Sequence, residues 1–163
     1  MDMPSTRDAQ TTHEHWIDVA RKIAGSATCA RAQCGTVIVA DGIVIGRGFN
    51  SPPGEHGTQR RCLVQKDSYD RKVTDKTCCV HAEQRAIIDA LRTHPDKLAD
   101  STLYFVRLDA QGAVAPSGAP YCTICSKMAL DVGIAYFALV HPEGVRLYET
   151  KEYNTLSYAY RSP

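Results

Sequence analysis

The chain has 163 residues, of which 44% are hydrophobic and 23% are charged, and its formal net charge is +1. That length suits one domain with a sizeable core, and the composition is ordinary for a globular protein. A net charge so close to zero supplies no basic field for a nucleic acid. No apolar run approaches the ~20 residues that cross a bilayer. We therefore expect neither a nucleic-acid nor a membrane partner.

The cysteines and the N-terminus indicate the compartment. Seven cysteines, an odd number, fit a complete disulfide framework poorly, and thiols that bind metal or pack in the core are typical of a reduced compartment. Residues 1–12 are polar and lack the apolar segment of a secretory signal. We expect a cytoplasmic protein in which residues 1–10 form a disordered lead and residues 11–163 form a single domain.

The order of secondary-structure signals predicts an α/β domain. Two β-branched segments flank Asp41-Gly42, a strong hairpin turn signal. A helical pattern precedes this hairpin, and strands alternate with helices after it, which favours a mixed sheet with helices on both faces. The Tyr-rich last 20 residues fit a helix, an edge strand or a contact between copies. The expected helices are 12–27, 80–92 and 122–132, and the expected strands are 34–40, 43–49, 101–108 and 134–140.

Two short motifs supply ligands that suit zinc. The first is His81-Ala82-Glu83, and the second is Cys122-x-x-Cys125. One histidine and two thiolates leave the fourth tetrahedral position open, as in a catalytic zinc site. Glu83 lies two residues from His81, so its carboxylate can stand beside the metal and move protons of a nucleophilic water. The alternatives are a purely structural zinc, or a core histidine and a cysteine pair that meet by chance.

Helix geometry restricts where these motifs can lie. In mid-helix, the side chains of His81 and Glu83 would point roughly 200° apart, so they converge only at the first turn of a helix. Cys122 and Cys125, at i and i+3, share one face of a first turn. The positive end of that helix dipole favours the thiolate form. We therefore expect two helix starts that face one metal.

The same residues resemble a known signature. H-x-E followed by P-C-x-x-C is typical of zinc nucleobase deaminases, although Tyr121 here separates the proline from Cys122. Residues 24–39 are similar to a run with S-x-C-x-R-x-x-V-G-x-V-I-V, and residues 48–54 resemble a G-Y-N-G-x-P-x-G loop with Ser51 in place of a glycine. Together these segments resemble the cytidine deaminase superfamily, and most of all its deoxycytidylate (dCMP) deaminase branch.

The resemblance implies a fold, a reaction and a site. The fold is the three-layer α/β/α cytidine deaminase-like fold. The reaction is hydrolytic deamination of a small cytosine-type nucleotide or nucleoside, of the dCMP or deoxycytidine class, by zinc-hydroxide attack with release of ammonia. Glu83 would be the catalytic proton shuttle. The implied zinc ligands are His81, Cys122 and Cys125, and the implied substrate contacts are Asn50 and the backbone N–H of Ala82.

The dCMP branch often carries Cys and His ligands for a second, structural zinc in the insert before H-A-E. Residues 50–78 form a polar connection whose length indicates a function or an ordering device. By resemblance, a second zinc there would order this connection. Cys29 and Cys34 are instead expected to be small buried hydrophobes. The candidate ligands are His56, Cys62, Cys78 and Cys79.

The substrate stays open at this point. Tyr121 and Ser51 depart from the family pattern, which keeps guanine, another purine or a non-nucleotide aminated heterocycle as alternative substrates. Tyr121 either lines the substrate pocket or fills a gap, and Asn50 either binds substrate or serves the turn that follows it. The cationic pairs 60–61 and 71–72 are either a solvated loop or a phosphate clamp.

An alternative function of a different class is a catalytically silent, zinc-stabilised binding module, which would have no use for Glu83. Against it, we expect an enzyme with a small-molecule substrate. The dCMP branch contains dimers and hexamers, so we also expect a homo-oligomer.

Overall fold

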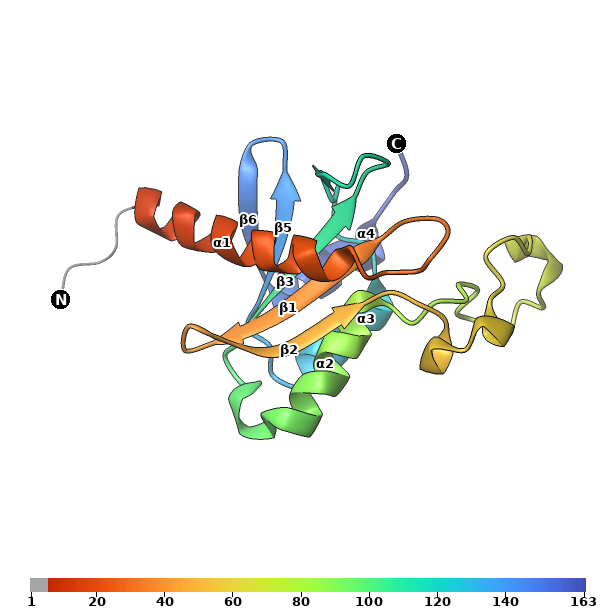
Figure 1. Ribbon diagram of the computed structural model, residues 1–163, viewed down its shortest axis with the longest axis horizontal. Helices are drawn as coiled ribbons and strands as arrows, with labels where there is room; N and C mark the ends of the chain where they lie inside the picture. Colours follow the sequence, from red (N-terminus) through yellow and green to blue (C-terminus); the bar gives the residue numbers. More distant parts are fainter. Residues whose placement is uncertain (1–5) are drawn as a thin grey trace.

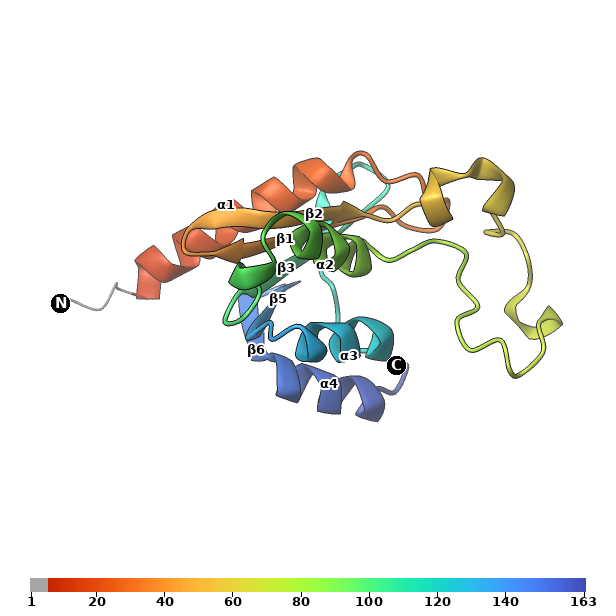
Figure 2. The ribbon, with the colours of Figure 1, turned by 90° about the horizontal axis from the view of Figure 1, so that it is seen from below.

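A computed structural model describes residues 6–163 as a mixed β-sheet covered by helices on both faces (Figures 1 and 2). The strand order is β2-β1-β3-β5-β6, and the short β4 pairs with β3. Of the strand pairs in this described part of the chain, only β3–β5 is parallel. The strands are β1 (Cys34–Ala40), β2 (Ile43–Phe49), β3 (Thr102–Leu108), β4 (Val114–Ala115), β5 (Tyr136–His141) and β6 (Gly144–Glu149); the helices are α1 (Thr6–Ala24), α2 (Ala82–Thr93), α3 (Thr123–Asp131) and α4 (Thr150–Ala159). The predicted three-layer α/β/α class is confirmed.

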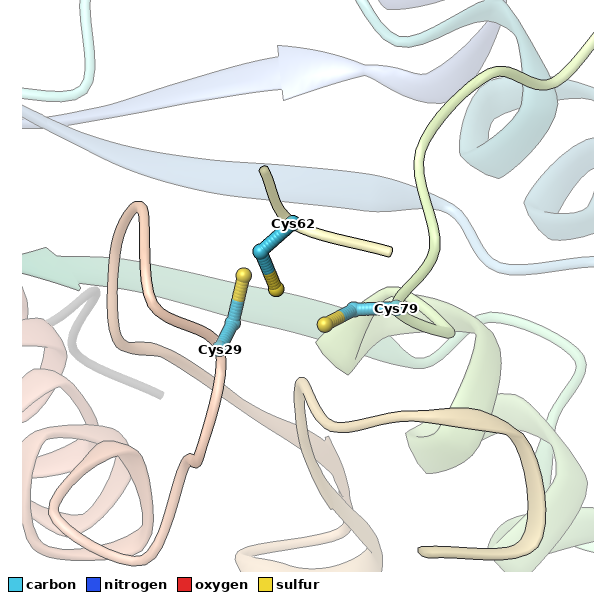
Figure 3. Close-up of side chains that lie close together, drawn as sticks. All are labelled: Cys29, Cys62 and Cys79. Atoms are coloured by element: carbon cyan, nitrogen blue, oxygen red, sulfur yellow. The ribbon is translucent and has the colours of Figure 1, made fainter. Parts of the chain in front are cut away.

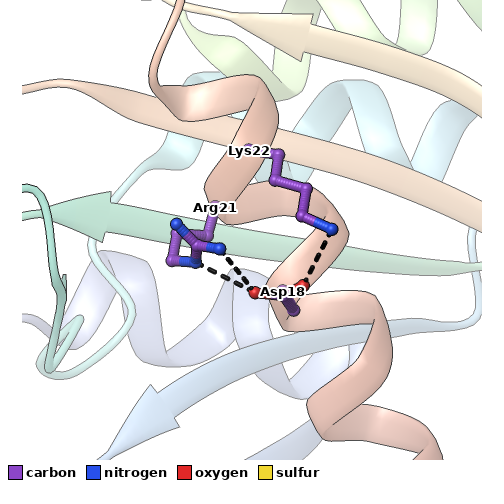
Figure 4. Close-up of polar contacts among 3 residues, drawn as sticks. All are labelled: Asp18, Arg21 and Lys22. Carbon is purple, nitrogen blue, oxygen red and sulfur yellow. Dashed lines mark hydrogen bonds and ion pairs between the residues drawn. The ribbon is translucent and has the colours of Figure 1, made fainter.

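Helix α1 begins earlier than its periodicity predicts. It starts at Thr6, so the expected disordered lead is wrong for residues 6–10, while residues 1–5 lie outside the described chain. No Gly or Pro interrupts residues 6–24, and nothing local therefore stops the helix from extending. On its exposed face, Asp18 accepts from Arg21 at 2.8 Å and pairs with Lys22 at 3.2 Å (Figure 4). Such exposed i,i+3 and i,i+4 pairs contribute little to stability.

The core has two layers, one on each face of the sheet. Val37, Val39 and Val106 face α1. Ile38, Leu103 and their neighbours face α2 and α3. Because both faces are covered, β1 is apolar at consecutive positions and does not alternate with polar residues.

Two glycines of β2 let α2 lie against the strand. A methyl group built on Gly48 would come within 2.6 Å of Ala86 N and 2.8 Å of Arg85 Cβ, and closer still to the Ala82 carbonyl oxygen. A methyl group on Gly46 would meet the next turn of the same helix. The close approach therefore fixes the height of the first turn of α2 above the sheet.

The two segments that the sequence left open have different structures. The Tyr-rich C-terminus forms edge strand β6 and then α4, so two of its three options occur together. The long connection runs from Asn50 to His81, carries three short 3₁₀ turns and projects from the sheet (Figures 1 and 2). Within the described residues, no helix is long and apolar enough to cross a membrane.

Candidate active site

His81 and Glu83 lie at the start of α2, as the helix geometry requires. His81 is the residue before the helix, with extended backbone, and Glu83 is in the first turn. The chain is held on entry because Val80 N donates to Ser51 O at 2.9 Å in an isolated β-bridge. Arg85, one turn into α2, donates to Pro52 O at 2.9 Å and so ties the helix to the same segment.

The two cysteines of the second motif lie at the start of α3. Cys122 caps the helix, and its sulfur accepts from Cys125 N at 3.4 Å. His81 Nδ1 lies 3.3 Å from each of the two sulfurs. Around a tetrahedral zinc with bonds of 2.0–2.3 Å, nitrogen and sulfur ligands are roughly 3.6 Å apart. The donor set and its spacing therefore fit zinc, and the ligand atoms lie within 4.8 Å of one another.

A side-chain bridge joins the start of α2 to the middle of α3. Gln84 Oε1 accepts from His81 N at 3.0 Å, and Gln84 Nε2 donates to Met128 Sδ of α3 at 3.7 Å. One amide thus fixes the backbone of His81 and contacts the helix that carries both cysteines. The metal-binding geometry is set by this helix–helix contact as well as by the sheet.

Electrostatics favour the charge states that a metal needs. Hydrogen bonds from Cys125 and His81 lower the pKa of the Cys122 thiol to about 5, so this sulfur is a thiolate near neutral pH. The contact with Cys122 raises the pKa of His81 to about 9. The metal-free pair is therefore an imidazolium beside a thiolate. A metal cation can replace the imidazolium proton, and its binding would release that proton.

Glu83 is the one carboxylate among the residues that line the neighbouring cavity. Its side chain is buried, with the residue 5% exposed. Burial raises its pKa to about 7, and the negative charge on Cys122 adds to this shift. A carboxyl group with a pKa near the working pH can both take up and release a proton efficiently.

A cavity of about 210 Å³ opens beside these groups. Phe105, Cys34 and the half-exposed Tyr121 form parts of its wall. Tyr121, flagged by the sequence, also contacts Tyr160 after α4, with ring centroids 5.6 Å apart. Burial raises the pKa of Cys34 to about 12, so that wall is a neutral thiol. The cationic residues that line the cavity are Arg31, Arg61, Lys66 and Lys76.

Asn50 and Ala82, which the family resemblance gives as substrate contacts, both line the cavity. The Asn50 side-chain amide also forms hydrogen bonds with the backbone: Oδ1 accepts from Cys34 N and Nδ2 donates to Ala32 O, both at 2.9 Å. It thus braces the turn before β1, with one lone pair and one hydrogen left over. Ala82 is the first residue of α2, so its N–H has no partner inside the helix.

A second group of thiols lies beside the cavity. The sulfurs of Cys29, Cys62 and Cys79 lie within 4.8 Å of one another (Figure 3). Cys78 Sγ is 3.3 Å from Cys62 Sγ and 3.8 Å from Cys79 Sγ. Of the predicted second set, His56 is absent from both metal-competent groups found in the described residues, because its ring turns onto Gly54.

Cys29 takes the place of His56 in this group of thiols. This differs from the expectation that Cys29 is only a small buried hydrophobe. It reaches the group from the connection between α1 and β1, 33 positions before Cys62. Such a long-range approach leaves no local pattern in the sequence. The available signal was the cysteine count, since core packing was the one role assigned to Cys29.

Comparison with known proteins gives a family match and a shared fold. Residues 10–140 match the sequence model of the cytidine and deoxycytidylate deaminase zinc-binding region. The dCMP deaminase of cyanophage S-TIM5, solved with dCMP and dUMP, is similar with a TM-score of 0.56 and 19% identity, over 83% of this chain and 82% of that one. Cytidine deaminase from Burkholderia pseudomallei has a TM-score of 0.57 and 19% identity, over 86% and 94% of the two chains. These structures establish the shared fold. No curated protein sequence matches.

Proposed function

This chain belongs to the cytidine and deoxycytidylate deaminase family, and on that premise we propose that it is a zinc-dependent hydrolytic deaminase of a small cytosine-type nucleotide or nucleoside. One observation carries the proposal. His81, Cys122 and Cys125 converge at two helix starts, and a buried carboxylate lies beside them in the wall of a cavity. A purely structural zinc would require neither the cavity nor Glu83.

The zinc would be held by His81 Nδ1 and by the Cys122 and Cys125 sulfurs. When bound, it supplies a Lewis acid that lowers the pKa of a water molecule in its open position. Glu83 would accept one proton of this water and deliver it to the ring nitrogen. It would then accept the second proton, from the hydroxyl group added to the ring carbon, and deliver it to the amine that leaves as ammonia. Burial holds the pKa of the Glu83 carboxyl above its usual range in the metal-free site, which suits a group that both takes up and releases a proton.

The start of α2 and the cavity wall orient the base. The Ala82 N–H points from a helix N-terminus, where backbone donors are available to a carbonyl oxygen of the substrate. Asn50 keeps one amide hydrogen and one lone pair beyond its backbone contacts, and these reach toward the substrate sugar. Tyr121 would pack against the substrate at the mouth of the cavity, where it is 57% exposed.

The charge of the cavity favours a phosphorylated substrate. Among the described residues, four cationic side chains line it and only one carboxylate does. Of the clamp residues suggested by the sequence, Arg61 lines the cavity, whereas Arg60 is bound to Thr28 O at 2.7 Å. A nucleoside or a free base would leave these cations without a partner, so the expected substrate is a cytosine nucleotide of the dCMP class.

Two variants of the connection test the phosphate contact. Replacing Lys66 and Lys76 together by alanine should lower kcat/KM for dCMP by about tenfold or more, because each lost contact is a charge-assisted hydrogen bond. The value for deoxycytidine should not change. Lys72→Ala is the matched control, because Lys72 lies in the same connection but outside the cavity lining. An equal loss for dCMP and deoxycytidine would contradict a phosphate site.

The second thiol group supports a second, structural metal position. Cys29, Cys62 and Cys79 offer three sulfurs that are close enough to share one metal, and Cys78, whose sulfur is 3.3 Å from Cys62 Sγ, would supply the fourth ligand of a structural zinc. Metal analysis should give two zinc per chain in the parent protein and one in Cys62→Ser. His56→Ala is the matched control and should retain two. One zinc in the parent protein would dismiss this site.

Ammonia release from a substrate panel tests the main proposal. The panel is dCMP, deoxycytidine, cytidine, cytosine, guanine and adenosine, each incubated with the zinc-loaded protein. Release from dCMP above all others is expected. Release from guanine or adenosine alone would transfer the same chemistry to a purine, and release from none would refute the proposal.

A further inference from the structure

The residues that precede His81 form a short series of polar contacts that ends at the His81 imidazole ring. Thr77 Oγ1 lies 3.3 Å from His81 Nε2, the ring nitrogen opposite the two cysteines. Thr77 Oγ1 also lies 2.6 Å from Asp75 Oδ1, and Thr77 N donates to that same oxygen at 3.1 Å. We propose that Thr77 and Asp75 are positioning residues that fix the tautomer and the direction of His81 at the metal. The inference rests on the zinc centre of the proposed function.

The hydrogens available on these groups fix the direction of each contact. A carboxylate can only accept, so the Thr77 hydroxyl must donate its one hydrogen to Asp75. The Thr77 oxygen then has only lone pairs to offer His81, and it can contact Nε2 favourably only if Nε2 carries a hydrogen. A neutral imidazole with its hydrogen on Nε2 has its lone pair on Nδ1. That is the atom 3.3 Å from both cysteine sulfurs.

Local hydrogen bonds hold this series of polar contacts rigid. Asp75 binds both the amide and the hydroxyl of Thr77, two residues on, which locks the rotamer of the threonine. Val80 is fixed to Ser51 by the β-bridge, so the segment is anchored immediately before His81. The ring is therefore held from Nε2 by a side chain and from its backbone by Gln84.

The proposal gives the long connection a role at the metal. Histidine ligands ordinarily donate their second ring N–H to an oxygen, which orients the ring and raises its basicity, and loss of that partner typically costs 10–100-fold in metal affinity. Here the oxygen belongs to a hydroxyl that is itself polarised by a carboxylate. Both residues are exposed to solvent, so they serve no core packing.

Zinc affinity in a matched set of variants tests this. Thr77→Val keeps the shape but removes the oxygen, and should weaken zinc binding at His81 by about 10–100-fold in competition with a chelator. Thr77→Ser restores the hydroxyl and should recover most of that affinity. Asp75→Ala should fall between them, because the hydroxyl remains but can rotate. Thr74→Val, in the same exposed segment, is the control and should match the parent protein.

Nitrogen NMR of labelled histidine provides a readout that a merely structural role would not change. In the zinc-loaded protein the His81 ring should carry its hydrogen on Nε2, and Thr77→Val should speed the exchange of that hydrogen with solvent. A hydrogen on Nδ1, or equal zinc affinity in Thr77→Val and Thr77→Ser, would overturn the inference. If zinc fails to bind His81 in the parent protein, the proposed function fails too. If zinc binds the parent protein and Thr77→Val binds it equally well, only this inference fails.

Discussion

Gly48→Ala tests whether the packing of β2 sets the position of the site. The added methyl would meet backbone of the first two turns of α2, including Ala86 N at 2.6 Å and the still closer Ala82 oxygen. Carbon atoms in ordinary contact are 3.5–4.0 Å apart, so the helix must move by roughly 1 Å or the strand must bend. The first turn that would move carries Glu83 and follows His81 directly.

The expected effect of Gly48→Ala has two parts, a loss of stability from overpacking the core and a loss of rate from misplacing a catalytic group. Overpacking a dense core costs about 1–3 kcal/mol, which corresponds to a loss of about 2–12 °C in Tm for a domain of this size. A misplacement of about 1 Å at a catalytic group can cost about 10²-fold in rate. We therefore expect a modest fall in Tm together with a fall of about 10²-fold in kcat for deamination.

Gly35→Ala is the matched control for this prediction. A methyl there would meet the backbone of α1, for example Ala24 Cα at 2.8 Å, on the other face of the sheet. Thermal unfolding and ammonia release should show a similar loss of Tm in both variants, but a loss of kcat only in Gly48→Ala. Equal kcat values in the two variants, at temperatures where both are folded, would refute the claim that this contact positions the site.

Two further predictions concern stability. Ser126 Oγ donates to Asn154 Oδ1 at 2.7 Å and joins α3 to α4, so Ser126→Ala should lower the free energy of unfolding in urea by about 1–3 kcal/mol, and an unchanged value would contradict a role for this bond. Burial lowers the pKa of His13 below its usual value. The unfolded chain therefore binds the proton more readily, and stability should fall as the pH drops below about 6.5. This fall should be smaller in His13→Gln, and identical pH profiles would contradict it.

The sequence predicted those parts of the site that depend on local geometry. The requirement that His81 and Glu83 converge placed the first motif at a helix start, and the structure has α2 beginning at Ala82. The Asp41-Gly42 signal likewise located the hairpin, whose two residues both have positive φ. In each case the signal and the structure lie within a few residues of each other, so tertiary contacts did not need to be known.

Features that depend on distant contacts were not predicted. Cys29 joins the thiol group only because the connection between α1 and β1 lies beside the segment around Cys62. Asn50 was assigned to the substrate from resemblance, yet its amide also braces the turn at Cys34, which only the fold shows. The role of Thr77 needed the direction of the His81 ring. Residue types were visible in each case, but the partners were not.

The central claim is that Glu83 moves protons for a hydrolysis at a zinc held by His81, Cys122 and Cys125. The most direct test compares the parent protein with Glu83→Gln, which keeps the shape but cannot accept the proton, by measuring ammonia release from dCMP and zinc content in the same samples. We expect equal zinc content and a fall in kcat of at least about 10²-fold, since general acid–base catalysis contributes 10²–10⁴-fold. Parental turnover in Glu83→Gln with zinc bound would contradict the account.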